Sequence, residues 1–330
     1  MPERVAAVVV TYNRRALLEQ CLAGLRSQTR APATIVVVDN CSTDGTAELL
    51  AAVSGGPGTP LHSVRTPENL GGAGGFALGM ERALALDPDW LWLMDDDSVP
   101  EADSLERLLA AAEALNQVLP EAAPGQGRTG LQPSVGFLAS RVLWKDGSPH
   151  GMNVPGRMSR YRARAVPGGL EAVDYASFVS LLVRREAVRA CGLPIAEFFI
   201  GSDDVEYTWR LTRAGFGGYL VHSSRVRHLT ADNAGIDVWN LPVEPGQLEK
   251  SVCKIRNLVA VNRRRPWGWL REGLRVVLLP LAWRLRGVGA AERRQLARGA
   301  RAGLWWNYEA LIRYPCAPSD KPRAPAPDAP

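Results

Sequence analysis

The sequence lacks any apolar run long enough to cross a membrane, and it is poor in cysteine and histidine. The first fifteen residues hold a short apolar stretch that leads into a polar loop without a small-residue cleavage site, so we expect a first strand and no signal peptide. The five cysteines are scattered and form no C-x-x-C pair, which argues against a disulfide framework or a zinc knuckle. This usage fits the reducing cytoplasm.

The remaining composition is that of a globular protein with an uneven charge distribution. Hydrophobic residues make up 46% of the 330 residues and charged residues 22%, so a substantial core is expected. Residues 245–330 carry 17 Lys+Arg and 6 Asp+Glu, whereas residues 1–244 carry 22 and 28. Five of the ten tryptophans also lie in residues 245–330. This basic, Trp-rich region indicates an anionic partner, either a membrane or a nucleic acid.

The first 120 residues alternate between strand and helix patterns. Apolar runs at 5–10, 34–38, 61–66 and 90–94 predict strands, separated by segments of helical spacing. Such alternation predicts an α/β fold with a mostly parallel sheet and helices on both faces. Ligands of these sheets bind beyond the carboxyl ends of the strands. Pro100 stands in an allowed first-turn position and predicts a further helix to about Val118. Later in the chain, apolar residues predict strands at 175–183 and 219–221, and residues 185–191 predict a short helix.

Three consecutive carboxylates, Asp95, Asp96 and Asp97, follow the strand predicted at 90–94. Adjacent carboxylates repel one another unless a cation or a set of donors lies between them. We therefore predict a site for Mg²⁺ or Mn²⁺ that leaves open positions for diphosphate oxygens. The alternative is capping of a helix by Asp97 or Ser98, but capping needs only one of the three acids.

A glycine-rich loop is predicted at 69–75. Gly72, Gly74 and Ala77 match the G-x-G-x-x-G/A pattern, with a carboxylate roughly 20 residues further on, so a nicotinamide-dependent Rossmann oxidoreductase is an alternative. Residues 67–70 separate these glycines from their strand, and a ribose-binding acid need not be a triplet. Either interpretation places a phosphate near backbone amides at a helix start.

Asp203 and Asp204 stand where a helix over 205–214 would begin. A helix N-terminus stabilises carboxylates as anions, which favours a base over an acid. The alternative is capping, with Glu206 completing an acidic first turn. His228 follows a strand-like stretch. A lone histidine is more often structural than a ligand, and the residues alone leave its role open.

Residues 267–286 alternate apolar clusters with arginines and are interrupted by Pro280. Such a stretch can lie in a membrane interface, or it can pack on the body with solvated arginines. Nucleic acid is not expected, because no binding motif accompanies the basic residues. We divide the chain into residues 1–244, a basic helical region at 245–314 and a disordered Pro/Ala-rich tail at 315–330.

Five segments, in this order, resemble glycosyltransferase family 2, the inverting enzymes of the GT-A fold. They are VVVTYNR (8–14), VVVDNCSTDGT (36–46), NLGGAGGFALGM (69–80), WLMDDD (92–97) and FFIGSDDVEYTWRLTRAG (198–215). The glycine-rich segment and the acidic triplet look most like bacterial galactofuranosyltransferases of the galactan-initiating type and related rhamnosyltransferases. Residues 119–172 match no motif of the family and are expected to recognise the acceptor.

The resemblance implies a role for each matching residue. Asp204 would be the general base, and Asp203 would orient the acceptor. Asp95, Asp97 and His228 would hold Mn²⁺ or Mg²⁺. The residues implied to bind or shape the nucleotide-sugar donor are Thr11, Asn13, Arg14, Asp39, Asn69, Gly71, Gly72, Gly74, Asp95 and Asp96. Arg256-Asn257 resembles a further element of this branch, for which no role is implied.

The expected activity is metal-dependent, inverting transfer of galactofuranose or rhamnose from a UDP- or TDP-linked donor to a glycan or lipid-linked glycan acceptor. The expected setting is cell-envelope polysaccharide synthesis in the cytoplasm, at the inner face of the membrane, with peripheral contact through 249–314. The alternatives are the oxidoreductase and a non-catalytic, membrane-associated scaffold on a transferase fold.

Overall fold

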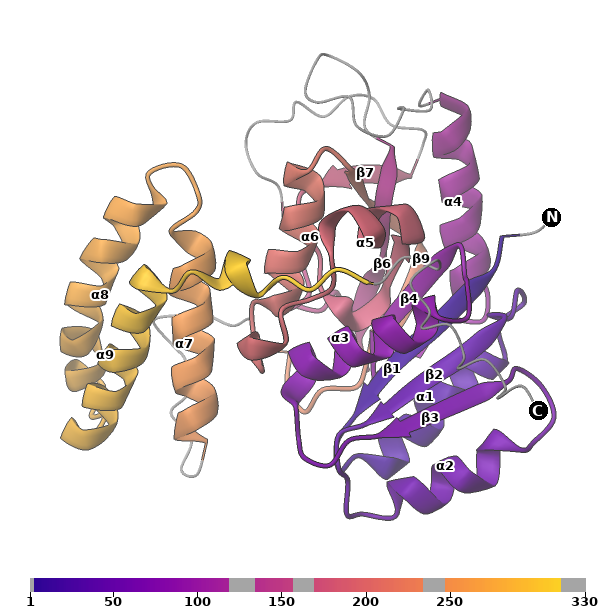
Figure 1. Ribbon diagram of the computed structural model, residues 1–330, viewed down its shortest axis with the longest axis horizontal. Helices are drawn as coiled ribbons and strands as arrows, with labels where there is room; N and C mark the ends of the chain where they lie inside the picture. Colours follow the sequence, from indigo (N-terminus) through magenta and orange to yellow (C-terminus); the bar gives the residue numbers. More distant parts are fainter. Residues whose placement is uncertain (1–2, 119–133, 157–168, 234–246, 316–330) are drawn as a thin grey trace, which may run out of the picture.

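A mixed sheet of nine strands lies at the centre of the part of the molecule that the computed structural model describes, residues 3–118, 134–156, 169–233 and 247–315. The strand order is β3-β2-β1-β4-β8-β6-β9-β5, and β7 pairs with β9 (Figure 1). The strands are β1 (Val5–Thr11), β2 (Thr34–Asp39), β3 (Leu61–Arg65), β4 (Trp90–Asp95), β5 (Ser98–Pro100), β6 (Val135–Trp144), β7 (Leu170–Val173), β8 (Leu181–Arg184) and β9 (Gly217–His228). The predicted α/β class is confirmed.

The first half of the sheet, from β3 to β4, is parallel, as predicted. Strands β1, β2 and β4 are buried on both faces because helices cover both sides. The helices of this half are α1 (Arg15–Arg26), α2 (Thr46–Ser54), α3 (Gly71–Leu84) and α4 (Ser104–Val118). The pairing sets Thr11 opposite Asp39 and Val10 opposite Asp95. The polar ends of β1, β2 and β4 therefore meet at one edge of the sheet.

The second half makes the sheet mixed, since β8 runs antiparallel to both β4 and β6. The predicted start of the next helix at Pro100 is wrong. Ser98–Pro100 form β5, which pairs antiparallel with β9, and α4 begins only at Ser104. Proline is tolerated in β5 because β5 ends the strand order, where a missing N–H breaks no ladder.

Two further boundaries differ from the sequence pattern. The strand expected over 175–183 divides into a 3₁₀ helix, η1 (Phe178–Ser180), and β8. The short strand expected at 219–221 is part of the twelve-residue β9, whose partners change along its length from β7 to β5. The predicted short helix is confirmed as α5 (Arg185–Cys191), and α6 (Asp203–Arg213) begins at the predicted acidic pair after η2 (Ala196–Phe198).

The glycine-rich segment is not a loop, because α3 starts at Gly71 and runs through the glycines. The glycines permit close contact between this helix and the sheet. A Cβ on Gly75 would collide with Val10, and one on Gly79 would collide with Val8. Packing of α3 on β1 thus outweighs the low helix propensity of glycine.

Three C-terminal helices, α7 (Leu248–Asn262), α8 (Gly268–Leu285) and α9 (Ala290–Trp305), form a bundle with an apolar core of its own (Figure 1). Helix α7 lies next to the α/β body. Pro280 does not interrupt α8, because Leu279 and Trp283 on either side of it are packed in the bundle core. In the described residues, no helix combines the length and the apolar character that a membrane span requires.

After α9 the chain returns to the body through η4 (Tyr308–Leu311), and the backbone N–H of Leu193 donates to the carbonyl of Arg313. Parts of the predicted acceptor region (119–133 and 157–168) and of the predicted tail (316–330) lie outside the described residues. The predicted division of the chain at residues 244 and 245 stays a prediction.

Candidate active site

Asp95 is the last residue of β4, and Asp96 and Asp97 form the turn that leads to β5. The Thr11 hydroxyl donates to Oδ2 of Asp96 at 2.8 Å, and the Arg14 guanidinium donates to Asp96 at 3.3 Å and to Asp97 at 2.8 Å. Residues at the end of β1 therefore hold two of the three carboxylates. The capping alternative is wrong, because no helix begins beside the triplet.

His228, the last residue of β9, lies against Asp97. Its Nε2 is 2.9 Å from Asp97 Oδ1, and its Nδ1 is 2.9 Å from Asn153 Oδ1. Ligand atoms of Asp95, Asp97 and His228 lie within 4.8 Å of one another. Carboxylates suit Mg²⁺ and Mn²⁺, and a histidine ligand commonly donates its other N–H to a fixed oxygen, as His228 can to Asn153. These residues fit a divalent cation.

Electrostatics at the triplet favour a bound cation. Burial, together with the charge of Asp97, raises the pKa of Asp95 to about 7, and burial raises the pKa of Asp96 to about 6 despite Arg14. Burial alone would also raise the pKa of Asp97, but the hydrogen bond and charge of His228 hold it below its ordinary value. The acids thus repel one another, and a divalent ion would relieve that repulsion.

The loops after β1 and β2 are joined around Asp39. Asn13, at φ 52°, accepts a hydrogen bond from the backbone N–H of Thr43 at 2.7 Å, and its own N–H donates to Ser42. The N–H of Ser42 donates to Oδ1 of Asp39 at 2.8 Å. Among the described residues, the buried Oδ2 of Asp39 has no hydrogen-bond partner, and the Arg65 guanidinium is 3.9 Å away. One acceptor of Asp39 therefore remains for a donor group on a ligand.

The start of α3 packs directly on the loop that precedes α6. Asn69 accepts the N–H of Gly71 at 2.8 Å, and the N–H of Ala73 donates to the Phe199 carbonyl at 3.2 Å. Gly71 has φ 69°, and a Cβ there would collide with the same carbonyl. Gly72 has open space around its Cα, while Gly74 lies against Leu70. The glycines thus join this segment to the acidic pair of α6.

Asp203 and Asp204 occupy the first turn of α6 and are half-buried. Burial raises the pKa of both carboxyls, and the charges of Asp204 and Asp95 raise that of Asp203 further. The acidic pair therefore binds a proton more readily than a solvated aspartate does. Glu206 pairs with Arg210 at 3.0 Å and takes no part in a cap.

The loop before this pair has an unusual backbone that Asn257 holds in place. Phe199, Gly201 and Ser202 all have positive φ, and such a conformation is costly for residues other than glycine. The two side-chain N–H groups of the buried Asn257, on α7, donate to the carbonyls of Phe198, Ile200 and Gly201 at 2.7, 3.0 and 2.9 Å, so that one N–H is shared between two carbonyls. The bundle thus holds the backbone that presents Asp203 and Asp204.

Arg256 orients Asn257 by donating to its side-chain oxygen at 2.9 and 3.0 Å, and it also donates to the Glu197 carbonyl. The function of Arg256-Asn257 was missed from the sequence because hydrogen bonds to distant carbonyls leave no local pattern. Asn153 was missed for the same reason, 75 residues from His228 in the sequence.

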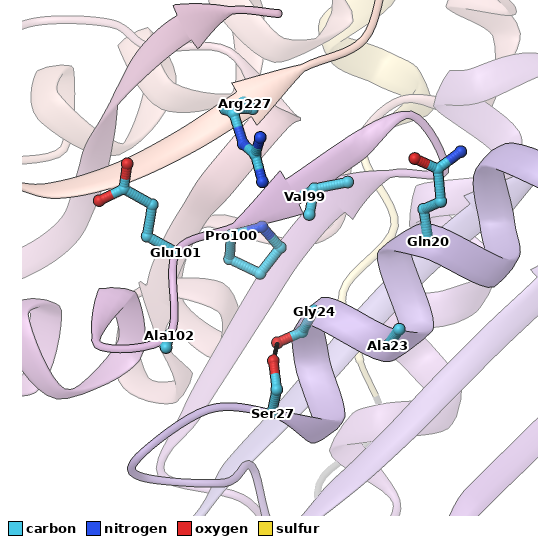
Figure 2. A pocket seen from close by; sticks show the side chains of 9 residues that line it. All are labelled: Gln20, Ala23, Gly24, Ser27, Val99, Pro100, Glu101, Ala102 and Arg227. Atoms are coloured by element: carbon cyan, nitrogen blue, oxygen red, sulfur yellow. Dashed lines mark hydrogen bonds between the residues drawn. The ribbon is translucent and has the colours of Figure 1, made fainter. Parts of the chain in front are cut away.

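A separate surface pocket lies between α1 and β5 (Figure 2). None of the predicted site residues lines it. Its lining is formed by Gln20, Ala23, Gly24, Ser27, Val99, Pro100, Glu101, Ala102 and Arg227. We assign it no part in the site.

Comparison with known proteins identifies the family. Residues 6–158 match the model of glycosyl transferase family 2. Galactofuranosyltransferase GlfT1 of Mycolicibacterium smegmatis is 36% identical over 228 residues, which are 67% of this chain and 70% of the relative. The N-acetylglucosaminyl-diphospho-decaprenol L-rhamnosyltransferase of Mycobacterium tuberculosis is 28% identical over 315 residues, 87% of this chain and 91% of the relative.

Among solved structures, mannosyltransferase PcManGT from Pyrobaculum calidifontis, in complex with GDP-Man and Mn²⁺, shares the fold. Its TM-score is 0.51 at 17% identity, over 94% of this chain and 83% of that one. The family match rejects the oxidoreductase alternative. The scaffold alternative assumes a degenerate site, whereas the acidic triplet and the Asp203-Asp204 pair are both intact. The chain belongs to glycosyltransferase family 2 and is a glycosyltransferase enzyme.

Proposed function

We propose that the enzyme transfers galactofuranose or rhamnose, with inversion, from a UDP- or TDP-linked donor to a glycan or lipid-linked glycan acceptor of the cell envelope. The observation that carries this proposal is the position of two acidic groups. Asp95, Asp97 and His228 form one cluster at the edge of the sheet, and the charge of Asp95 raises the pKa of Asp203 on α6. The names of the two relatives support the choice of sugars.

The donor half of the proposed site is formed by the ends of β1, β2 and β4 and by the start of α3. The free acceptor of Asp39 suits an N–H of the nucleotide base. Thr11 and Arg14 position Asp96, which helps to orient the sugar. The remaining donor residues in this proposal are Asn13, Asn69, Gly71, Gly72 and Gly74.

The proposed metal residues are Asp95, Asp97 and His228, with Asn153 fixing the imidazole. A bound Mn²⁺ or Mg²⁺ would supply positive charge to the nucleotide diphosphate as it departs. Arg14, which is half exposed beside Asp96 and Asp97, adds a fixed positive charge at the same place.

The acceptor half is formed by Asp203 and Asp204. Asp204 takes the proton of an acceptor hydroxyl, and the oxygen attacks the anomeric carbon as the bond to the nucleotide diphosphate breaks on the opposite face. The configuration is inverted, and no covalent enzyme intermediate forms. Burial and the charge of Asp204 raise the pKa of Asp203, and in its protonated form Asp203 can donate a hydrogen bond that orients the acceptor.

We also propose that the enzyme acts in the cytoplasm, at the inner face of the cell membrane, because a lipid-linked acceptor would be found there. The basic residues within 249–314 suit contact with an anionic surface.

A panel of nucleotide sugars tests this function directly. With Mn²⁺ and a lipid-linked glycan acceptor present, we expect release of nucleotide diphosphate with UDP-galactofuranose or TDP-rhamnose, and slower hydrolysis of the same donor without acceptor. UDP-glucose serves as the control donor. If neither of the two donors is consumed while UDP-glucose is, the sugar assignment is wrong.

Asn257→Ala should lower kcat by about 10²-fold with little change in the donor KM, because displacement of a catalytic group by about 1 Å can cost that much. The substitution leaves three loop carbonyls without their donor, whereas the donor residues keep their contacts. Steady-state kinetics with separate kcat and KM values measure the effect.

Asn262→Ala is the matched control, since Asn262 is also buried on α7 but donates nothing to this loop. Thermal melting is measured for both variants. An equal loss of activity in the two variants, in proportion to lost stability, would show that Asn257 has no specific positioning role.

A further inference from the structure

Helix α8 carries apolar residues on two opposite faces. The inner face, Gly268, Glu272, Val276, Leu279 and Trp283, is buried against the bundle. The outer face is open to solvent and follows the same helical spacing of three and four residues. It consists of Trp267, Leu270, Leu274, Val277, Leu278, Leu281 and Leu285. We call this set the α8 outer face.

The side chains of the α8 outer face are strongly exposed. The exposed fractions of Trp267, Val277 and Leu285 are 86%, 73% and 80%. Helix α8 also lies on the side of the bundle away from the α/β body (Figure 1). A contiguous apolar stripe of this kind marks a surface for a partner or a membrane.

The charges beside the α8 outer face are positive. Arg271 is exposed on one flank, and Arg284 is exposed on the other. The acid of this helix, Glu272, is fully buried on the inner face, where Arg271 and Arg275 pair with it at 3.4 and 2.8 Å. The described surface of α8 thus offers apolar and cationic groups and no acidic one.

Exposed tryptophans lie at the end of the bundle where α8 begins. Trp267 and Trp269 open the helix, and Trp305 at the end of α9 stacks edge-on with Trp269 at 5.9 Å. Tryptophan favours the interface between lipid and water because its ring is apolar and its N–H is polar. A protein partner or a second copy would not require arginine on both flanks.

We propose that α8 docks along the surface of an anionic lipid bilayer, with the α8 outer face among the acyl chains and the flanking arginines at lipid phosphates. An interfacial helix binds in this way through apolar area and attraction to anionic headgroups. The bundle then holds the active site at the membrane, since Asn257 of α7 contacts the loop before Asp203. The inference rests on the proposed function for its setting, yet vesicle binding can be measured without any sugar transfer.

Vesicle flotation with the full chain tests the proposal. We expect the protein to float with phosphatidylcholine vesicles that contain about one third phosphatidylglycerol, and much less with pure phosphatidylcholine. Leu274→Glu should reduce the bound fraction at least about tenfold, because it puts an anion into the apolar stripe. Arg284→Gln should weaken binding to the anionic vesicles only.

Val118→Glu is the matched control, because Val118 on α4 is 58% exposed and Leu274 is 61% exposed. Circular dichroism establishes that both variants keep the fold. The proposal is overturned if the wild-type protein does not float, or if the two glutamate variants float equally. It is also overturned if light scattering shows a dimer that Leu274→Glu dissociates while no vesicle binds, since the face would then belong to a second copy. If the wild-type protein floats with the vesicles but transfers no sugar, the proposed function is contradicted and this inference stands.

Discussion

Asp204→Asn should reduce sugar transfer by about 10²–10⁴-fold, the range typical for loss of a general base, and leave donor binding unchanged. The amide has the shape of the carboxylate and can still accept the N–H of Val205, which Asp204 now accepts at 2.7 Å. It cannot take a proton from the acceptor hydroxyl. Single-turnover transfer rates and calorimetric binding of the nucleotide diphosphate measure the two quantities separately.

The control for this substitution is Asp103→Asn, which removes an exposed carboxylate paired with Arg107 and should change neither quantity. Burial raises the pKa of Asp204 to about 6. Because the ionised form is the base, kcat of the wild-type enzyme should fall as the pH drops through that value, and the residual rate of Asp204→Asn should lack this dependence. If donor affinity fell in step with transfer, the carboxylate would belong to the donor site and not to the base.

The parallel half of the sheet was predictable because its signals are local. Apolar runs at β1, β2 and β4 end in polar residues, and parallel pairing necessarily gathers such ends. Thr11 therefore lies opposite Asp39, and Val10 lies opposite Asp95, as the strand pattern required. The acidic start of α6 is local as well, and the structure has it at the predicted residue.

The antiparallel half was less predictable because its pairing joins distant residues. Ser98 pairs with His228 across 130 positions, so β5 could not be distinguished from the start of a helix. The same pairing brings His228 to Asp97. From the residues alone that histidine had no assigned role, and only the family resemblance pointed to it. Asn153 and Asn257 act through single hydrogen-bonding groups, for which composition and spacing hold no signal.

The helix over the glycine-rich segment could not be predicted for a different reason. Its glycines predict a loop because glycine has a low helix propensity, and they match a dinucleotide pattern by spacing alone. Contacts with β1 and with the Phe199 carbonyl explain them instead, since a Cβ on Gly71, Gly75 or Gly79 would collide with those neighbours. The same residue type thus serves close packing here, and no propensity scale separates the two uses.

Removal of divalent metal should abolish transfer, with a loss of about 10²-fold or more, and Mn²⁺ or Mg²⁺ should restore it. Burial alone would lower the pKa of His228, but its hydrogen bond to Asp97 and the charges of Asp97 and Asp95 raise it. A metal and a proton compete for His228, so the affinity for the metal should fall as the pH is lowered. Titration of Mn²⁺ by electron paramagnetic resonance measures binding independently of activity.

His228→Gln should weaken Mn²⁺ binding at least about tenfold, and Asn153→Ala by about tenfold, because a residue that fixes a ligand typically contributes that much. The matched control is His222→Gln, since His222 lies on the same strand but is half exposed and pairs with Glu171 away from the triplet. The affinity of His222→Gln for Mn²⁺ should equal that of the wild-type enzyme. Undiminished turnover in EDTA would reject a catalytic metal. Equal Mn²⁺ binding by the His222 and His228 variants would show that His228 is not a metal ligand.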